Sequence, residues 1–363
     1  MRLKNDGMQR NAIPAVVQAL LAALLFGVST PISKFFLGEI EPVPLVAFLY
    51  LGSGIGLAIF QIIQRDKQPE NTEASLKRSD IGWLTGAVLT GGVIAPIILL
   101  FSLRDTPGAI ASLLLNFEGV ATTLIAASIF KEAVSRRAWL AIIVITAASI
   151  LLSVMPDEGW GISLSAVGVL VACFFWGVDN NFTRNISSKN PVSIVMIKGF
   201  AAGTFSLFLA IILGNQLPDW TTIIKAMLLG SLSYGLSITL FIRAMRGLGA
   251  ARTSALYGTA PLAGVTLSFV LLNESGSSLF LIALLLMIVG AVLLVYEEHH
   301  HSHMHEAVVH EHWHQHDDDH HLHHHDDLKP VRAHSHEHKH DQQEHTHHHM
   351  PDIHHRHTHN SDE

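Results

Sequence analysis

The sequence predicts an all-α membrane protein with ten transmembrane helices, arranged as two inverted five-helix repeats, followed by a disordered tail. Three observations predict this fold class. Ten apolar stretches each have about the 20 residues needed to cross the roughly 30 Å hydrocarbon core of a bilayer. Two segments of the first half recur in the second half. All 26 histidines follow Glu298, in a final segment with little apolar content.

The body that precedes the tail is apolar and nearly neutral. It holds 19 Lys and Arg, 17 Asp and Glu, and no histidine, whereas the tail holds 13 acids and only 4 bases. Hydrophobic residues make up 49% of the chain and charged residues 15%, which is typical of a chain embedded in lipid. The single cysteine, Cys173, lies in an apolar stretch and cannot form a disulfide within the chain. The sequence therefore favours neither an oxidised extracellular fold nor redox chemistry.

The ten predicted helices are joined by short connections, which favours antiparallel neighbours in a bundle. The first stretch is too long for a signal peptide and lacks a small-residue cleavage site, so it is interpreted as a helix. The predicted helices span 14–36, 43–63, 80–103, 107–130, 137–155, 162–184, 192–214, 222–243, 250–272 and 277–296. The predicted organisation is an N-terminal segment (1–12), two five-helix units (13–155 and 156–298) and the tail (299–363).

Basic residues between the helices orient the chain, because Lys and Arg are retained on the cytoplasmic side of a membrane. With the N-terminus inside, fifteen bases lie on the inner side and three on the outer side. The inner bases are Arg2, Lys4, Arg10, Arg65, Lys67, Lys77, Arg78, Lys131, Arg136, Arg137, Arg184, Lys189, Arg243, Arg246 and Arg252, and the outer ones are Lys34, Arg104 and Lys225. This bias predicts a multi-pass protein of the cell inner membrane with both termini in the cytoplasm.

A segment near the end of each half shows the clearest internal similarity. ASLLLNFEGVATTLIAASIFKE at 111–132 resembles TSALYGTAPLAGVTLSFVLLNE at 253–274. The shift that sets Ala111 on Thr253, here called the repeat offset, also places Glu132 on Glu274 at the same end of a predicted helix. Self-similarity at a fixed offset indicates a duplicated unit.

A second pair of segments supports the duplication. ALLFGVSTPISK at 23–34 resembles CFFWGVDNNFTR at 173–184 and sets Gly27 on Gly177. Because each unit has an odd number of helices, the two units have opposite orientations in the membrane. Inverted repeats are common in alternating-access transporters, where the substrate binds near the midplane between the halves.

The arrangement resembles the drug/metabolite transporter superfamily, and specifically its EamA family, over about residues 12–298. The resemblance is carried by Glu132 and Glu274, by Pro261, and by LLLNFEG at 113–119. It implies two EamA-like five-helix repeats and transport of metabolites or other small solutes, often export, driven by ion gradients or exchange. The chain has no GxxxxGK[ST] loop for binding ATP phosphates, which agrees with that implication.

Glu118 is the sharpest candidate for a transport residue. It stands near the centre of the fourth predicted helix beside Asn116, and the corresponding helix of the second half carries Gly258 and Pro261. Ionisable side chains in mid-membrane indicate function by default, and helix-weakening residues at matching places in both halves point to a transporter site. A carboxylate shielded from water could bind a proton or a cationic substrate and change affinity on protonation. The alternative is a structural pair with a neighbouring helix.

A polar group in the sixth predicted helix is the second candidate. Asp179, Asn180 and Asn181 follow Trp176, so they could give a ligand polar contacts and an aromatic wall. The alternative is an interfacial cap on the helix, anchored by Arg184.

Two residues of other helices are predicted to lie near these groups. Lys198 in the seventh helix is expected to form an ion pair with Asp179, with a structural role favoured over ligand binding. Tyr257 aligns with Leu115 and is expected to face the region of Glu118. The predicted substrate-binding residues are Glu118, Asn116, Asp179, Asn180, Tyr257, Trp176 and Lys198, and no catalytic residue is predicted.

Two further features are predicted to be structural. Glu132 and Glu274 end helices, where a carboxylate is unfavourable to the helix dipole, so each requires another partner such as the start of a helix. Small residues at regular spacing predict close helix packing at Gly52, Gly54, Gly56, Gly199 and Gly203.

The tail is predicted to bind metal at several weak, exchanging sites, because His alternates with Asp and Glu in patterns suited to Zn, Ni, Co or Cu. Without metal it is expected to be disordered, since its apolar content is too small to fold. The predicted ligands are His299, His300, His301, His303, His305, His310, His312, His314, His316, His320, His321, His323, His324, His325, His334, His336, His338 and His340. The alternative is a pH-sensitive polyanion. No cofactor is predicted to be required.

These observations favour a secondary active transporter, expected to export a small metabolite or drug-like solute, whose tail binds divalent metal as a regulator or store. One alternative is a Ni, Co or Zn exporter fed by the tail, and another is a membrane-anchored metal sensor or buffer. An enzyme is not expected, because the body has no histidine for a triad or a zinc site. The expected partners are the lipid bilayer, a small-molecule substrate and metal ions but no nucleic acid, with a homodimer left open.

Overall fold

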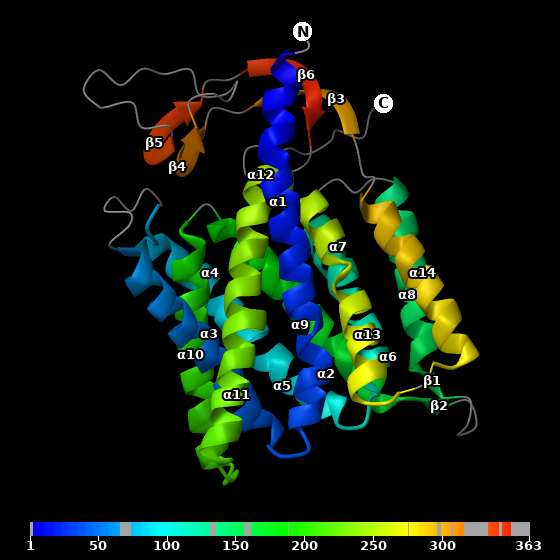
Figure 1. Cartoon of the computed structure of the whole chain (residues 1–363). Helices are drawn as coiled ribbons and strands as arrows, with labels where there is room; N and C mark the ends of the chain where they lie inside the picture. The colour runs from blue at the N-terminus through cyan, green and yellow to red at the C-terminus, as the bar shows by residue number, and fades with distance from the viewer. Residues whose placement is uncertain are drawn as a thin grey trace.

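The computed structural model describes residues 3–65, 74–130, 136–155, 161–187, 189–274, 276–295, 299–305, 308–315, 333–340 and 343–349. Its body is a bundle of helices that run side by side along one axis (Figure 1). The helix α1 begins and the helix α14 ends at the same end of this bundle (Figure 1).

The first half contains eight α-helices and two helices of other types among its described residues. They are α1 (Leu3–Gly27), α2 (Ser29–Phe36), α3 (Pro42–Arg65), the 3₁₀-helix η1 (Arg78–Asp80), α4 (Ile81–Ala87), the π-helix η2 (Val88–Ile94), α5 (Ala95–Leu103), α6 (Gly108–Leu114), α7 (Phe117–Ser128) and α8 (Arg136–Ser153). The segments from η1 to α5 follow one another without a loop.

The second half follows a short antiparallel pair of strands, β1 (Val154–Met155) and β2 (Gly161–Ile162). Its helices are α9 (Leu164–Ile186), α10 (Pro191–Ile212), α11 (Trp220–Gly230), the π-helix η4 (Ser231–Leu236), α12 (Ser237–Tyr257), α13 (Ala260–Leu271) and α14 (Ser278–Val295). The N-cap residue of α11 is Asp219, whose carboxylate accepts hydrogen bonds from the Thr222 hydroxyl at 2.8 Å and from the Thr222 and Thr221 backbone N–H groups at 3.2 and 2.8 Å. These bonds, above all that of the Thr222 hydroxyl, lower the pKa of the exposed Asp219 carboxyl, because they stabilise its charged form.

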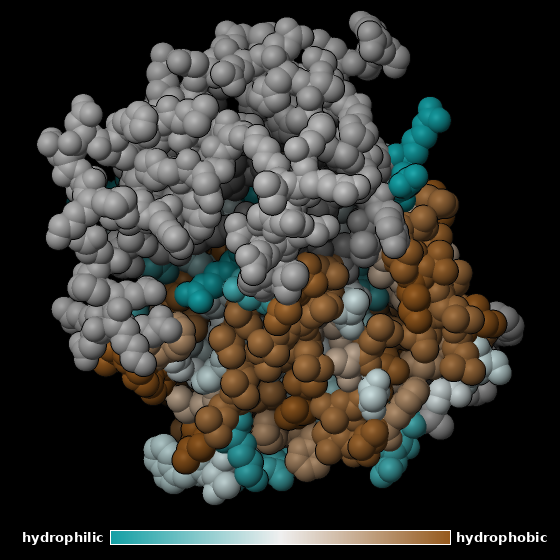
Figure 2. Space-filling model, turned by 45° about the horizontal axis from the view of Figure 1, so that its top comes forward, coloured by the Kyte–Doolittle hydropathy of each residue, from teal (hydrophilic) through white to brown (hydrophobic). Residues whose placement is uncertain are grey.

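The surface of the body is that of a multi-pass membrane protein. Seven described helical stretches are long and apolar enough to cross a membrane, and three shorter apolar helices accompany them. Large apolar side chains point outward, including Ile62, Leu285 and Val270 at 70, 65 and 74% exposure. Figure 2 shows these apolar surfaces as a brown region with hydrophilic residues at its margins. Such a surface is stable in lipid, whereas in water it would exceed the apolar patch of an ordinary soluble protein.

Glycines allow α3 and α10 to pack closely. A Cβ atom added to Gly199 would lie 2.7 Å from the Gly54 backbone nitrogen, and one added to Gly203 would lie 2.6 Å from the Leu51 nitrogen. The other side of α3 is equally close to α11, where a Cβ on Gly52 would overlap the Met227 backbone. The predicted packing role of these glycines is confirmed, because any side chain here would push the helices apart.

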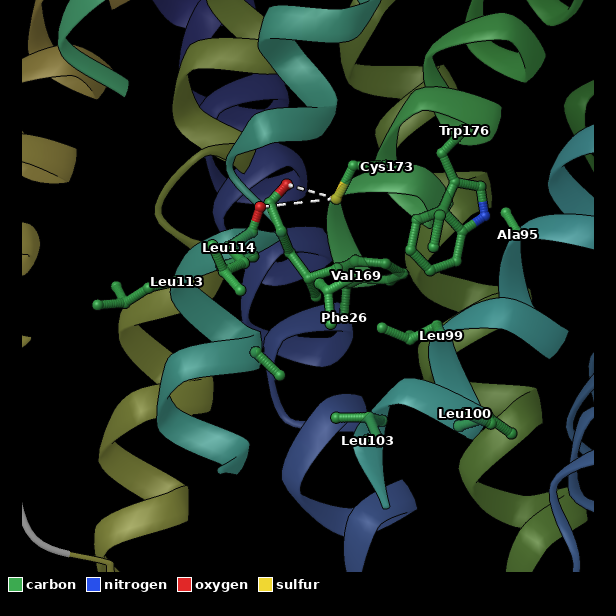
Figure 3. Close-up of a cluster of buried hydrophobic side chains, with 14 of the residues drawn as sticks. Phe26, Ala95, Leu99, Leu100, Leu103, Leu113, Leu114, Val169, Cys173 and Trp176 are labelled. Atoms are coloured by element: carbon green, nitrogen blue, oxygen red, sulfur yellow. Dashed lines mark hydrogen bonds between the residues drawn. The ribbon is translucent and has the colours of Figure 1, made fainter. Parts of the chain in front are cut away.

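The fourth predicted helix, 107–130, is broken into α6 and α7 at Leu115 and Asn116. Pro107 precedes α6, and its missing N–H suits the start of a helix. At the break, the buried Cys173 thiol donates to the carbonyl oxygens of Leu114 and Leu115 at 3.6 and 3.9 Å (Figure 3). Around this thiol, α5, α6 and α9 bury the apolar core that Figure 3 shows. The break therefore lies inside the protein, where one side chain from another helix binds its carbonyl groups.

The second half differs from the predicted connection at 244–249 and from the predicted helix at 250–272. Residues 244–249 are helical, because α12 runs without interruption from Ser237 to Tyr257, and the next helix begins only at Ala260. Pro107 of the first half corresponds to Gly249 at the repeat offset. Unlike proline, glycine has a backbone N–H that can donate within the helix, so α12 can continue through this position. Gly247 and Gly249 lower helix propensity without ending the helix.

Both halves contain a π-helical turn where the sequence predicts regular helices at 80–103 and 222–243. Shifting 89–94 of η2 by the repeat offset gives 231–236, which are the residues of η4. A π-helical turn holds one extra residue and exposes backbone groups, and such turns are frequent at functional sites. Periodic hydrophobicity alone gives no sign of the extra residue.

In the tail, β3 (His299–His305) pairs with β6 (Gln343–His349), and β4 (Val308–Gln315) pairs with β5 (Ala333–His340), both antiparallel. This differs from the expected tail without regular structure. The alternation of His with other residues has the two-residue period of a strand, which explains why these segments can pair.

Candidate functional site

The candidate site lies in the middle of the bundle, where α7 packs against α9. Glu118 is in the first turn of α7, and its Oε1 accepts a hydrogen bond from Asn180 Nδ2 at 2.8 Å. The same amide donates to Thr122 Oγ1 at 3.2 Å. Glu118 is half-buried, and the group that reaches it is a neutral amide. The break before α7 places the carboxylate in the first turn of a helix, where the partial positive charge of the helix start favours a negative charge.

Asp179 and Lys198 form a buried ion pair beside Glu118. Their side chains are only 7 and 9% exposed, and Asp179 Oδ1 also accepts from Thr183 Oγ1 at 3.0 Å. The predicted ion pair is confirmed. Both residues are close enough to act electrostatically on Glu118. Because Lys198 is bound to Asp179, the pair is internally neutral, and the charge of Glu118 is the one that needs a further partner.

The π-helix η2 presents a backbone carbonyl to this group of residues. The Gly91 oxygen accepts from Tyr50 Oη at 2.7 Å and from Trp176 Nε1 at 3.0 Å. A Cβ on Gly91 would overlap the Asp179 carboxylate, so glycine is required for the approach. The polar edge of Trp176 is therefore occupied by the protein, and its ring is buried.

An aromatic cluster centred on Phe26 adjoins the polar residues, and Figure 3 shows two of its members, Phe26 and Trp176. The Phe26 ring centroid lies 5.4 Å from that of Tyr257, 6.0 Å from Tyr234 and 6.3 Å from Trp176. Tyr257 is close enough to Glu118 for electrostatic interaction, as the alignment of the halves predicts. Aromatic faces of this kind can bind apolar or cationic groups.

Asn181 and Gly177 hold the two helices of the site together, and Asn116 stands at the start of α7. Asn116 is half-buried at the N-cap of α7, and no side-chain cap forms there. Asn181 donates from Nδ2 to the Gly177 oxygen at 2.8 Å and to the Thr122 oxygen at 3.1 Å, which ties α9 to α7. A Cβ on Gly177 would lie 2.8 Å from the Ala121 Cβ, so the glycine allows this approach.

The structure thus brings the seven predicted substrate-binding residues to one region of the bundle centre. Sequence reasoning missed Tyr50, Thr122, Tyr234 and Phe26. Phe26 had a usable signal, because the alignment that sets Gly27 on Gly177 also sets Phe26 on Trp176. The others gave no signal, since a hydroxyl inside an apolar helix is common and commonly structural.

The predicted metal ligands of the tail fall into two groups. His316, His320, His321, His323, His324 and His325 lie outside the described residues. The remaining ones lie in β3, β4 and β5, where the backbone is described and the side chains are not. Metal binding by the tail stays a prediction. In the described part of the chain, no group of three or more His, Cys, Asp or Glu side chains could hold a metal ion.

Comparison with known proteins gives three similarities. The model of the EamA-like transporter family matches residues 13–154 and 163–296. An uncharacterized transporter of Methanothermobacter thermautotrophicus is 28% identical over 283 residues, covering 74% of this chain and 82% of that protein. A solved structure titled "Crystal structure of protein" superposes with a TM-score of 0.59 at 18% identity, over 77% of this chain and 94% of the other, which shows a shared fold.

Proposed function

Because the chain belongs to the EamA-like transporter family, we propose that it is a secondary active transporter that exports a small metabolite or drug-like solute across the inner membrane. Membership of this family makes it a membrane transporter. The direction of transport, its coupling to an ion gradient and the class of solute are what we propose. The observation that carries it is Glu118, a half-buried acid in the bundle centre that is bound by an amide and not by a base.

A carboxylate in this position requires compensation of its charge within a medium that solvates ions poorly. Lys198 does not supply it, because its ammonium binds Asp179. A proton or a positively charged group of the solute can neutralise Glu118 in turn. Competition between the two at one carboxylate couples solute movement to the proton gradient. The aromatic cluster around Phe26 supplies apolar surface for the rest of such a solute.

We also propose that the body consists of ten membrane-spanning segments in two inverted repeats. Two facts support it besides the sequence similarity. The π-helical turns coincide when one is shifted by the repeat offset. Two equivalent close contacts join the halves, since a Cβ on Gly177 would meet Ala121 and a Cβ on Gly27 would meet Ala263, the counterpart of Ala121 at the repeat offset. With ten segments, the bias of basic residues puts both termini in the cytoplasm.

The role of the tail distinguishes the proposed solute exporter from a metal exporter, and gene deletions in growing cells test the difference. In the proposed function, the tail binds divalent metal as a regulator or store, and metal is not the cargo. Deleting the whole gene should leave the cell content of Ni, Co, Zn and Cu unchanged within about twofold, whereas deleting residues 299–363 alone should alter how solute export responds to added metal. The measurements are metal content by elemental analysis and solute efflux with and without metal.

The contrary result is equally clear. A full deletion that raises the content of one metal several-fold, with restoration by the intact gene and not by the truncated gene, would identify a metal exporter fed by the tail. The matched control is a chain in which the tail histidines are replaced by Asn and Gln at equal length. This control separates loss of imidazole from loss of the segment itself.

A further inference from the structure

One end of the bundle, opposite the end where α1 begins, holds a junction between the two halves (Figure 1). The end of α2, the connection from α5 to α6 and the end of α13 meet there. We call the junction the α13 latch and define it by Lys34, residues 103–109 and Glu274. None of these residues belongs to the candidate site.

Glu274 binds the start of α6 across the junction. Its Oε1 accepts from the Gly108 backbone N–H at 2.6 Å and its Oε2 from the Ala109 N–H at 2.8 Å. The prediction that this acid finds the start of another helix is confirmed, while Glu132 lies outside the described residues. Glu274 belongs to the second half and α6 to the first, so these charge-assisted bonds join the halves. The contact is tight, because a Cβ on Gly108 would lie 2.9 Å from Leu272 Cδ1.

Lys34 binds the same connection from the other side. Its Nζ donates to the Leu103 oxygen at 2.8 Å and to the Thr106 oxygen at 2.7 Å, where α5 ends. Lys34 and Glu274 also attract one another electrostatically. The connection is therefore held through its carbonyl groups by a cation and through its N–H groups by an anion, as the partial charges of helix ends favour.

The closed junction has a cost as well. Three buried hydroxyl oxygens near it, those of Ser33, Thr106 and Ser268, have no hydrogen-bond partner among the described protein atoms. A buried hydroxyl without a partner destabilises the folded protein by about as much as one charge-assisted hydrogen bond stabilises it. Opening this end to water would hydrate the three hydroxyls and break the Glu274 bonds.

Among the described residues of the opposite end, the helix start at α6 has no counterpart. The residues that align with 103–109 are 245–251, which lie inside the uninterrupted helix α12. Their N–H groups belong to that helix and are not the start of a new one. Beside Glu118 at the centre, a Cβ on Gly119 would meet no atom within 4 Å, so this stretch of α7 borders open space.

We propose that the α13 latch is a gate of the transport cycle: its bonds hold this end closed, and breaking the bonds from Glu274 to Gly108 and Ala109 opens this end while the other end closes. The inference rests on the proposed function, because a gate has meaning only in a transporter. In this proposal, the Glu274 bonds stabilise the state in which this end is closed relative to the state in which it is open.

Thiol labelling in vesicles tests the gate without any substrate. In a Cys173→Ser background, which keeps a donor for the Leu114 carbonyl, one reporter is Ser268→Cys, buried at the latch, and the other is Thr123→Cys on α7. A charged, membrane-impermeant thiol reagent is added to vesicles of both orientations. Glu274→Ala should raise the labelling rate of the Ser268→Cys reporter about tenfold, since a lost charge-assisted bond shifts a two-state balance by about that factor. The rate of the Thr123→Cys reporter should fall.

Opposite changes at the two reporters support the gate. Equal rates with and without Glu274→Ala overturn it, and so do increases at both reporters, which would indicate general loosening. The matched control is Asp219→Asn, which neutralises an exposed acid outside the latch and keeps a side chain that can cap α11. Gly108→Ala is a second disruption that keeps Glu274, and it must shift both reporters in the same directions as Glu274→Ala. Because no solute is added, the labelling rates decide the gate whatever solute the protein carries. Failure of the unaltered protein to export any tested solute, with labelling that responds to Glu274→Ala as expected, would count against the proposed function alone.

Discussion

Replacing Glu118 by Gln is expected to abolish proton-coupled transport, with efflux reduced about 10- to 100-fold, the factor that follows from losing one hydrogen-bonded charge. The amide of Gln has nearly the shape of the acid and can still accept the bond from Asn180, so the fold is expected to be retained. It is permanently neutral, however, and can neither release a proton nor attract a cationic solute. The measurement is efflux of candidate solutes from proteoliposomes across a range of pH, with and without a proton gradient.

The control for this prediction is Glu41→Gln, which neutralises an exposed acid far from the centre. It should transport like the unaltered protein. If Glu118→Gln transports at the normal rate with the normal dependence on pH, then Glu118 is structural and the coupling proposal is wrong. If transport is retained but no longer responds to the proton gradient, the carboxylate is the coupling group and the solute is held by other residues.

Lys198→Met is expected to destabilise the protein by about 3–5 kcal/mol, because it leaves the Asp179 carboxylate buried without its partner. The methionine side chain has similar length, so the loss arises from charge and not from an empty volume. The measurement is the free energy or midpoint of unfolding in detergent micelles. A loss below about 1 kcal/mol would mean that Asp179 finds another partner or takes up a proton.

The paired substitution isolates the interaction. Asp179→Asn combined with Lys198→Met should recover most of the lost stability, since a neutral buried pair leaves no uncompensated charge. Lys225→Met is the matched control, because Lys225 is an exposed lysine on α11, and its change should be small. A double variant as unstable as the sum of the single variants would contradict an internally neutral pair.

The sequence predicted the helical membrane body because length and apolar content are conditions that a bilayer imposes on each segment separately. It could not predict where helices are interrupted or joined. The Cys173 thiol that binds the carbonyl oxygens at the break comes from another helix, and the periodicity of residues 107–130 contains no sign of it. Gly249 in place of Pro107 leaves a backbone N–H for a continuous α12, but periodicity does not show that the helix runs on.

In the candidate site, too, some contacts could be predicted from the sequence and others could not. The pairing of Asp179 with Lys198 was predictable, because two opposite charges at similar depth have no cheaper arrangement in lipid. The binding of Asn180 to Glu118 was not, since an amide can satisfy itself within its own helix. Glu274 was predictable in kind, as an acid that needs N–H donors, but its partner Gly108 is 166 residues away.

The shared position of η2 and η4 carries information about ancestry. A π-helical turn is an insertion of one residue into a helix, and two independent insertions would seldom fall at equivalent positions. The simplest history is that the ancestral five-helix chain already had the widened turn before its gene was copied and fused. Pro107, which has glycine as its counterpart, was then gained or lost in one copy afterwards. The halves thus inherited one helix defect in common and later came to differ at the neighbouring one.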